Sequence, residues 1–93
     1  MRIEFSLKAL NDVKEILEYY DSLNSTLPIR FLDRIGQAKD RIINTEKGFE
    51  IKYKNVRTLL LKQFPYHLHY VLKDDKIIII AVLHSRINPK SYL

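Results

Sequence analysis

Cysteine is absent from this 93-residue chain, so neither a disulfide nor a thiolate metal site can form. Small secreted domains usually depend on disulfides, because a short chain buries too little apolar surface for a large core. The lack of cysteine therefore favours a protein of the cytoplasm.

Long hydrophobic runs are also missing. The most apolar stretch, residues 77–83, is far shorter than the roughly 20 residues of a membrane-spanning helix. Arg2 and Glu4 interrupt the first apolar residues, unlike the continuous apolar core of a signal peptide. We therefore expect no membrane segment and a cytoplasmic location.

Glycine occurs at only two positions, Gly36 and Gly48. A glycine-rich phosphate loop and the glycine-flanked serine of a hydrolase both need more glycines, closer together. Nucleotide-dependent chemistry is therefore not expected, and we expect no cofactor.

Basic residues exceed acidic ones, sixteen Lys and Arg against eleven Asp and Glu, for a formal net charge of +5. This excess favours contact with nucleic acid or an acidic protein, although it also serves solubility alone. The length fits one hydrophobic core, so we expect residues 1–93 to form a single domain.

Hydrophobic periodicity divides the first half of the chain into a strand and two helices. Residues 2–6 alternate polar and apolar, as in a strand with one covered face. Apolar residues then recur at three-and-four spacing over residues 9–23 and 27–44, which predicts two amphipathic helices. The polar cluster at residues 21–26 breaks the pattern, so the helices form an antiparallel hairpin.

After Gly48 the pattern changes to short β-rich runs, at residues 49–53, 56–62, 66–73 and 76–84. They predict an antiparallel meander, in the order β-α-α-β-β-β with room for one short extra strand. The expected fold class is α+β: an N-terminal strand and a two-helix hairpin packed on one face of a mainly antiparallel sheet of four or five strands.

The two aspartates at residues 74–75 suit a tight hairpin turn. A two-residue turn pairs Lys73 with Lys76 and sets the register of both strands, which places Leu68 opposite Ala81.

This register sends all three histidines, His67, His69 and His84, to the face that the helices leave uncovered. Arg86 extends the same row, and Arg57 is expected near it, although its face is not fixed by the pattern. Such a face resembles a docking surface for a polar, negatively charged partner; the alternative is an ordinary half-solvated sheet face.

The same residues also suggest a three-histidine zinc site, because His67 and His69 alternate on one strand and His84 lies on the next. The expected pairing staggers the three rings, and no carboxylate is evident to orient them. We therefore expect no bound metal.

Two segments, Phe64–Tyr70 and Ala81–Pro89, together with the element order, resemble the RelE/ParE superfamily of toxins, also called plasmid stabilisation toxins. The first predicted helix is similar to theirs too, so the resemblance covers nearly the whole chain. It implies the toxin of a type II toxin–antitoxin system, held inactive by a cognate antitoxin in a hetero-oligomer. It also implies one of two targets: DNA gyrase, as in ParE, or ribosome-bound mRNA, as in the RelE endoribonucleases.

RNA cleavage without a metal needs a base, cations and a proton donor. By the resemblance, Arg86 matches the C-terminal arginine of the family, and Tyr92 falls where RelE-like enzymes carry a catalytic tyrosine. His67 lies where these enzymes often have an arginine, and His84 is a candidate base or acid near neutral pH. Arg57 is the fifth candidate.

One departure keeps both targets open. RelE-like enzymes carry two lysines on the strand before their phosphate-binding arginine, whereas residues 56–60 contain only Arg57 as a basic residue. The His-x-Arg of residues 84–86 and the Phe-Pro-Tyr of residues 64–66 are closer to the ParE-like branch. The alternative function is a non-catalytic protein-binding module, or a degenerate toxin that only binds its antitoxin.

Overall fold

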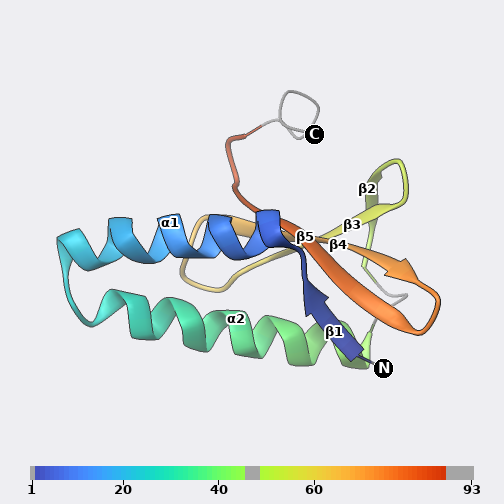
Figure 1. The fold of residues 1–93 in the computed structure, drawn as a ribbon, viewed down its shortest axis with the longest axis horizontal. Helices are drawn as coiled ribbons and strands as arrows, with labels where there is room; N and C mark the ends of the chain where they lie inside the picture. The colour runs from blue at the N-terminus through green and yellow to red at the C-terminus, as the bar shows by residue number, and fades with distance from the viewer. Residues whose placement is uncertain (1, 46–48, 88–93) are drawn as a thin grey trace.

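The computed structural model describes residues 2–45 and 49–87 (Figure 1). The elements follow in the order β1 (Arg2–Phe5), α1 (Leu7–Leu23), α2 (Leu27–Asn44), β2 (Ile51–Tyr53), β3 (Val56–Leu60), β4 (Tyr66–Lys73) and β5 (Lys76–His84). The predicted α+β class is confirmed, and β2 is the short extra strand.

The five strands form one mixed sheet in the order β1-β5-β4-β3-β2. Strands β2 to β5 are joined as an antiparallel meander, whereas β1 pairs in parallel with β5. A parallel pair needs a long crossover between its strands, and α1 and α2 are part of that connection.

The two helices lie antiparallel against one face of the sheet (Figure 1). Their buried apolar residues are those of the periodic stripes, with Ala9 and Ile16 on α1 and Phe31 and Ile42 on α2. They pack with buried side chains of the sheet, namely Leu59, Leu68, Tyr70, Ile77, Ile79 and Val82. Each fully buried aliphatic or aromatic side chain contributes about 1.5 to 3 kcal/mol, so this layer is the main source of stability.

Ser6 ends β1 and begins α1. Its backbone N–H donates to the Ile79 carbonyl at 2.9 Å, which is the last backbone hydrogen bond between this end of β1 and β5. Its hydroxyl accepts the Ala9 N–H at 3.1 Å, which caps the helix, and donates to the Ile80 carbonyl at 3.2 Å. Strand β5 therefore continues past the point where β1 leaves its side.

The hairpin of β4 and β5 has the predicted turn at residues 74–75, with Lys73 opposite Lys76. Asp74 adopts a positive φ of 55°, a conformation that aspartate tolerates in tight turns. The predicted register holds as far as Tyr70 opposite Ile79.

Beyond that pair the register shifts by one residue, because β5 contains an extra residue, Ile80. His69 lies opposite Ala81, and Leu68 lies opposite Val82 instead of Ala81 as expected. Successive side chains of a strand point to opposite faces, so one inserted residue exchanges the faces of everything that follows.

The shift corrects the prediction that the three histidines share one face. His84 lies opposite Tyr66 on the helix side, while His67 and His69 lie on the other side. We call this other side, with His67, His69, Val71 and Ile78, the uncovered sheet face.

Candidate functional site

A groove of about 230 Å³ runs along α1 beside the last part of β5. Its polar walls are Asp12, Glu15 and His84, and its aromatic walls are Tyr19 and Tyr66. Its apolar lining consists of Ile16, Val82, Leu83 and Ile87. We call this hollow the α1–β5 groove; it exists because β1 has already left the edge of β5 there.

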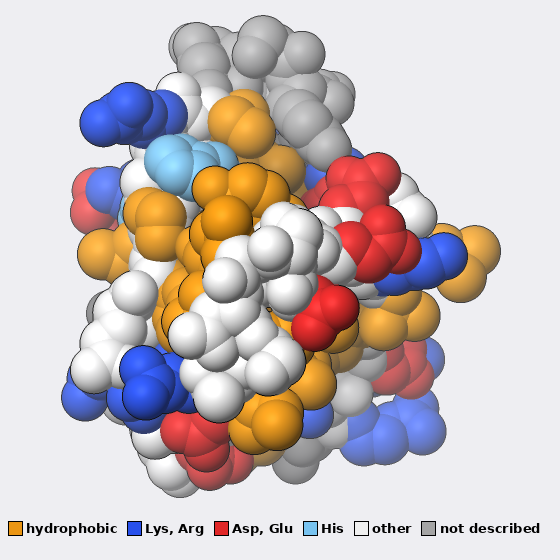
Figure 2. All heavy atoms as spheres, turned by 90° about the vertical axis from the view of Figure 1, so that its left-hand side faces the viewer, with side chains coloured by type: hydrophobic (Ala, Val, Ile, Leu, Met, Phe, Trp, Pro, Cys, Tyr) orange, Lys and Arg blue, Asp and Glu red, His pale blue; other side chains and the backbone are white. Residues whose placement is uncertain are grey.

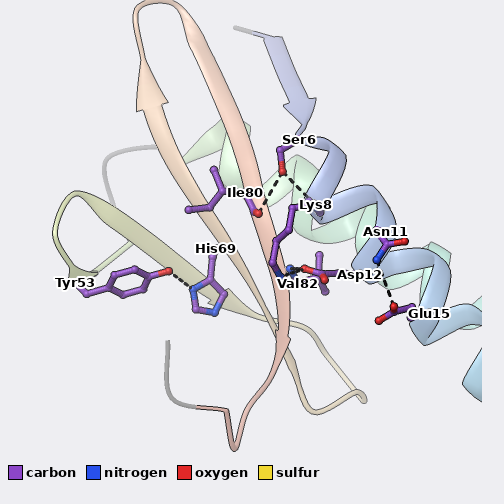
Figure 3. Close-up of polar contacts among 10 residues, drawn as sticks. Ser6, Lys8, Asn11, Asp12, Glu15, Tyr53, His69, Ile80 and Val82 are labelled. Atoms are coloured by element: carbon purple, nitrogen blue, oxygen red, sulfur yellow. Dashed lines mark hydrogen bonds and ion pairs between the residues drawn. The ribbon is translucent and has the colours of Figure 1, made fainter. Parts of the chain in front are cut away.

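Asp12 lies against the edge of β5 at Val82 (Figure 3). Its carboxylate accepts the backbone N–H of Val82 at 2.9 Å and pairs with the Lys8 ammonium at 2.6 Å. Asp12 is only 6% exposed, so a buried carboxylate stands where a neighbouring strand would otherwise accept this N–H. The spacing of Lys8 and Asp12, four residues apart on a helix, was the sequence signal for this pair, and the sequence reasoning did not assign it a role.

His84 is held in the groove by two neighbours. Its ring meets the Tyr66 ring edge-on, with centroids 5.3 Å apart, and its Nδ1 accepts the Arg86 backbone N–H at 3.1 Å. The second contact leaves Nε2 to carry the proton of the neutral ring. Arg86 itself lies exposed in the turn after β5.

An aromatic cluster supports this end of the groove. The Tyr20 ring lies 5.2 Å from Phe64 and 6.0 Å from Phe31, and Phe31 lies 5.8 Å from Tyr66. Burial raises the pKa of both Tyr20 and Tyr66, so both hydroxyls keep their protons at neutral pH. Figure 2 views this end of the molecule, where hydrophobic side chains gather beside a histidine and acidic side chains flank them.

On the uncovered sheet face, His69 is 4% exposed and shares a hydrogen bond of 3.0 Å between its Nδ1 and the Tyr53 hydroxyl (Figure 3). Burial lowers the pKa of His69 to about 4, with smaller contributions from the His67 ring and the Lys8 ammonium. Burial also lowers the pKa of His67, and the Lys52 ammonium adds to the effect. Both imidazoles are therefore neutral near pH 7.

Arg57 lies on neither the groove nor the uncovered sheet face. It pairs with Tyr70 across β3 and β4, so its side chain leaves the sheet on the helix side. Its guanidinium donates to the Phe49 carbonyl at 2.6 Å, which ties the segment before β2 to the sheet.

The four predicted site residues that the structure describes do not share one face. His67 is on the uncovered sheet face, Arg57 and His84 are on the helix side, and Arg86 is in the following turn, whose Ser85 hydroxyl lies 3.4 Å from His67 Nδ1. Tyr92 lies outside the described residues.

The three histidines do not form a metal site either, because His84 lies on the opposite face of the sheet from His67 and His69. Within residues 2–45 and 49–87, no group of three His, Asp or Glu side chains has the arrangement of a metal site.

Neither helix of this part of the chain is long and apolar enough to cross a membrane.

Comparison with known proteins agrees with this architecture. Residues 3–89 match the family described as ParE toxin of type II toxin–antitoxin system, parDE. The protein Y4kP of Sinorhizobium fredii (strain NBRC 101917 / NGR234), whose name describes a toxin, is 31% identical over 85 residues, which cover 90% of this chain and 88% of that protein.

A solved structure described as the chromosomal ParDE TA system from P. aeruginosa has the same fold. It superposes with a TM-score of 0.68 at 21% identity, and covers 90% of this chain and 95% of that one. The fold and the match over residues 3–89 define a toxin of a type II toxin–antitoxin system. The chain belongs to the ParE toxin family, within the RelE/ParE superfamily, and is neutralised by an antitoxin.

Proposed function

We propose that this toxin arrests growth by acting on DNA gyrase in the cytoplasm, and that Arg86 and the uncovered sheet face contact the target. The observation that carries the proposal is the separation of the candidate acid–base groups. His67 and His84 lie on opposite faces of the sheet, and the Arg57 guanidinium is bonded to the Phe49 carbonyl.

This separation bears on the choice between the two targets. Cleavage of RNA requires a base, a cation and a proton donor within reach of one phosphate. A binding surface has no such requirement, since affinity is spread over many contacts. Together with membership of the ParE family, this favours binding to gyrase over cleavage of ribosome-bound mRNA.

The uncovered sheet face has the character of a binding surface. It combines half-buried aliphatic residues, Val71 and Ile78, with the neutral, half-buried imidazole of His67, whereas His69 is buried. The exposed guanidinium of Arg86 follows β5, and the chain carries a net charge of +5. Such a surface suits an acidic protein target.

The test compares two reactions with the same purified protein. Gyrase supercoiling should be inhibited, and Arg86→Ala should weaken that inhibition about tenfold, as for the loss of one charged contact. Arg30→Ala, an exposed arginine on α2, is the matched control and should inhibit like the unaltered toxin.

Cleavage of mRNA on translating ribosomes, lost in Arg86→Ala while supercoiling proceeds normally, would replace gyrase by the RelE-like target. Induced expression that leaves growth unaffected would indicate a degenerate toxin that only binds its antitoxin.

A further inference from the structure

The positive charge of the chain is concentrated on α2 and on residues 49–62. α2 carries four basic residues against two acidic ones, and residues 49–62 carry four against one. α1 has the opposite balance, with two lysines against four acidic residues. The net charge of +5 is therefore spread unevenly, and most of it belongs to these two segments.

Three of these cations border one crease between α2 and the end of β3. The crease is lined by Arg34 and Arg41 of α2 and by Lys62, which follows β3. Arg34 and Arg41 are about two turns apart on the helix, so they lie on the same flank of α2. The crease has a volume of about 10 Å³, which is room for one oxygen atom but not for a nucleotide base.

A fourth cation, Arg57, continues this row. The Arg41 guanidinium lies over the Phe49 ring, 5.6 Å from its centroid, and the Arg57 guanidinium donates to the Phe49 carbonyl at 2.6 Å. Arg57 is therefore adjacent to Arg41 through Phe49. We call the four cations, Arg34, Arg41, Arg57 and Lys62, the α2–β3 basic edge.

Two of these guanidiniums are held in place by neutral acceptors. Arg34 donates from Nε and Nη2 to the Gln63 side-chain oxygen, at 3.1 and 2.6 Å, and Arg57 donates to a backbone carbonyl. A neutral oxygen fixes the position of a guanidinium but leaves its charge in place. Because a guanidinium has five N–H donors, others remain for a second acceptor.

Little negative charge lies close to the α2–β3 basic edge. Arg34 Nη1 is 3.3 Å from the carboxylate of Asp33, whose side chain is 63% exposed, and such an exposed pair is weak. No carboxylate of residues 2–45 and 49–87 lies within ion-pair distance of Arg41, Arg57 or Lys62. The edge therefore keeps most of its positive charge, which attracts a polyanion.

We propose that the α2–β3 basic edge binds the sugar–phosphate backbone of duplex DNA, without regard to base sequence. Duplex DNA carries about one negative charge per 1.7 Å of its axis, and cations that neutralise its phosphates release bound counterions. The crease admits a phosphate oxygen but no base, and the Phe49 ring beside it is half-buried under Arg41. The edge thus lacks the exposed aromatic platform on which single-stranded nucleic acid stacks.

This contact goes beyond the proposed action on gyrase, because DNA is bound whether or not gyrase is present. It also gives the toxin a second attachment where gyrase works. A toxin held on duplex DNA meets DNA-bound gyrase at a higher local concentration.

The main experiment measures binding of the purified toxin to a fluorescent DNA duplex of about 20 base pairs by anisotropy, at several salt concentrations. Four phosphate contacts predict that log K falls with log salt with a slope of about −3 to −4, roughly −0.9 for each contact. A second duplex of unrelated sequence should bind equally well. Absence of binding at about 50 mM salt, or a strong preference for one sequence, overturns the proposal.

Two variants locate the contact on the α2–β3 basic edge. Arg41→Gln and Lys62→Gln should each weaken binding about five- to tenfold at about 0.1 M salt and reduce the slope by about 0.9, whereas Arg41→Lys should keep the slope. Neither side chain forms a hydrogen bond or ion pair within the described part of the chain, so both variants should fold, which circular dichroism checks.

Lys14→Gln is the matched control, because it removes the same charge from an exposed position on α1. It should bind DNA like the unaltered toxin. An equal loss for Lys14→Gln would show that only the net charge matters, and would overturn the assignment to the α2–β3 basic edge.

Single-stranded RNA of the same length separates DNA from the other nucleic acid. It should bind more weakly, because each contact with a single strand releases fewer counterions. RNA bound as tightly as the duplex, or more tightly, overturns the proposal.

The outcome is separable from the proposed target. DNA binding with the expected variant pattern, but with normal gyrase supercoiling, rejects gyrase and keeps the DNA site. Supercoiling inhibited by a toxin that binds no DNA does the reverse.

Discussion

The Asp12 carboxylate lies 2.9 Å from the backbone nitrogen of Val82, seventy residues further along the chain. This bond joins the second turn of α1 to the last part of β5, at the point where the sheet has lost its outer strand. It is buried, and the same carboxylate holds the Lys8 ammonium.

Replacing Asp12 should lower the free energy of unfolding, by an amount that depends on the side chain that takes its place. Asp12→Ala leaves the buried Val82 N–H without its acceptor and should lower the free energy of unfolding by about 2 to 3 kcal/mol. Asp12→Asn keeps an acceptor oxygen and should lose less. Urea denaturation measures both, with Glu18→Ala as an exposed control that should change stability by less than about 0.5 kcal/mol.

Stability should decrease as the pH falls below the ordinary pKa of histidine. The pKa of His69 is about 4 in the fold and 6.5 in its absence, so between these values the unfolded chain binds more protons. The contribution of neutral His69 to the free energy of unfolding is complete above pH 6.5. It is lost progressively towards pH 4, and the total loss is about 3 kcal/mol at most.

His69→Gln keeps a hydrogen-bonding group near the Tyr53 hydroxyl but does not titrate, so its stability should vary less with pH. Denaturation at several pH values checks the difference in slope. His67, Lys8 and Asp12 also act on the pKa of His69, and His67, whose pKa is lowered too, should leave a smaller slope of the same sign. Identical profiles for the two proteins would show that His69 does not control this dependence.

Phe31 should be among the most sensitive core positions. It is fully buried and contacts Phe64 and Tyr66 at 5.2 and 5.8 Å between ring centroids. Phe31→Ala should cost about 3 to 5 kcal/mol because it leaves a cavity, while Phe31→Leu should cost less. Thermal unfolding followed by circular dichroism orders the two variants, and equal melting temperatures would contradict the packing described here.

Replacing Gly36 should raise the stability of the protein instead of lowering it. It lies within α2, and a methyl group added there would meet nothing within 4 Å. Because its φ is not positive, Gly36→Ala should stabilise the protein by about 0.5 to 1 kcal/mol through the lower entropy of the unfolded chain. Calorimetric melting against Gln37→Ala, a neighbouring exposed position, isolates the glycine effect; a lower melting temperature for Gly36→Ala would argue against an open position.

The sequence predicted the elements because each of their patterns has a physical period. Phe31 and Ile42 mark a helical stripe, and the turn at residues 74–75 sets the first rungs of the last hairpin. The order of these elements then pointed to the family, and the family resemblance supplied the antitoxin partner.

The positions of the histidines could not be predicted, because they depend on a single inserted residue. Residues 77–80 are four isoleucines, so the alternation that reveals a register is absent where Ile80 interrupts the pairing. Every residue after it was assigned to the wrong face, and His84 was therefore placed with His67 instead of with Tyr66. The place of Glu15 in the wall of the α1–β5 groove was missed for another reason: it depends on where β1 ends relative to β5, which no local pattern records.

The parallel pairing of β1 with β5 has a consequence for synthesis on the ribosome. Ile3 lies beside Ile77, so the first strand finds its partner only after the helices and the other strands have been made. Contacts between such distant residues form late in folding because closing a long loop is entropically unfavourable. The two helices can form early, but the edge that bears the α1–β5 groove cannot exist before β5 has emerged. A nascent chain therefore presents this surface to a partner only once β5 has been translated.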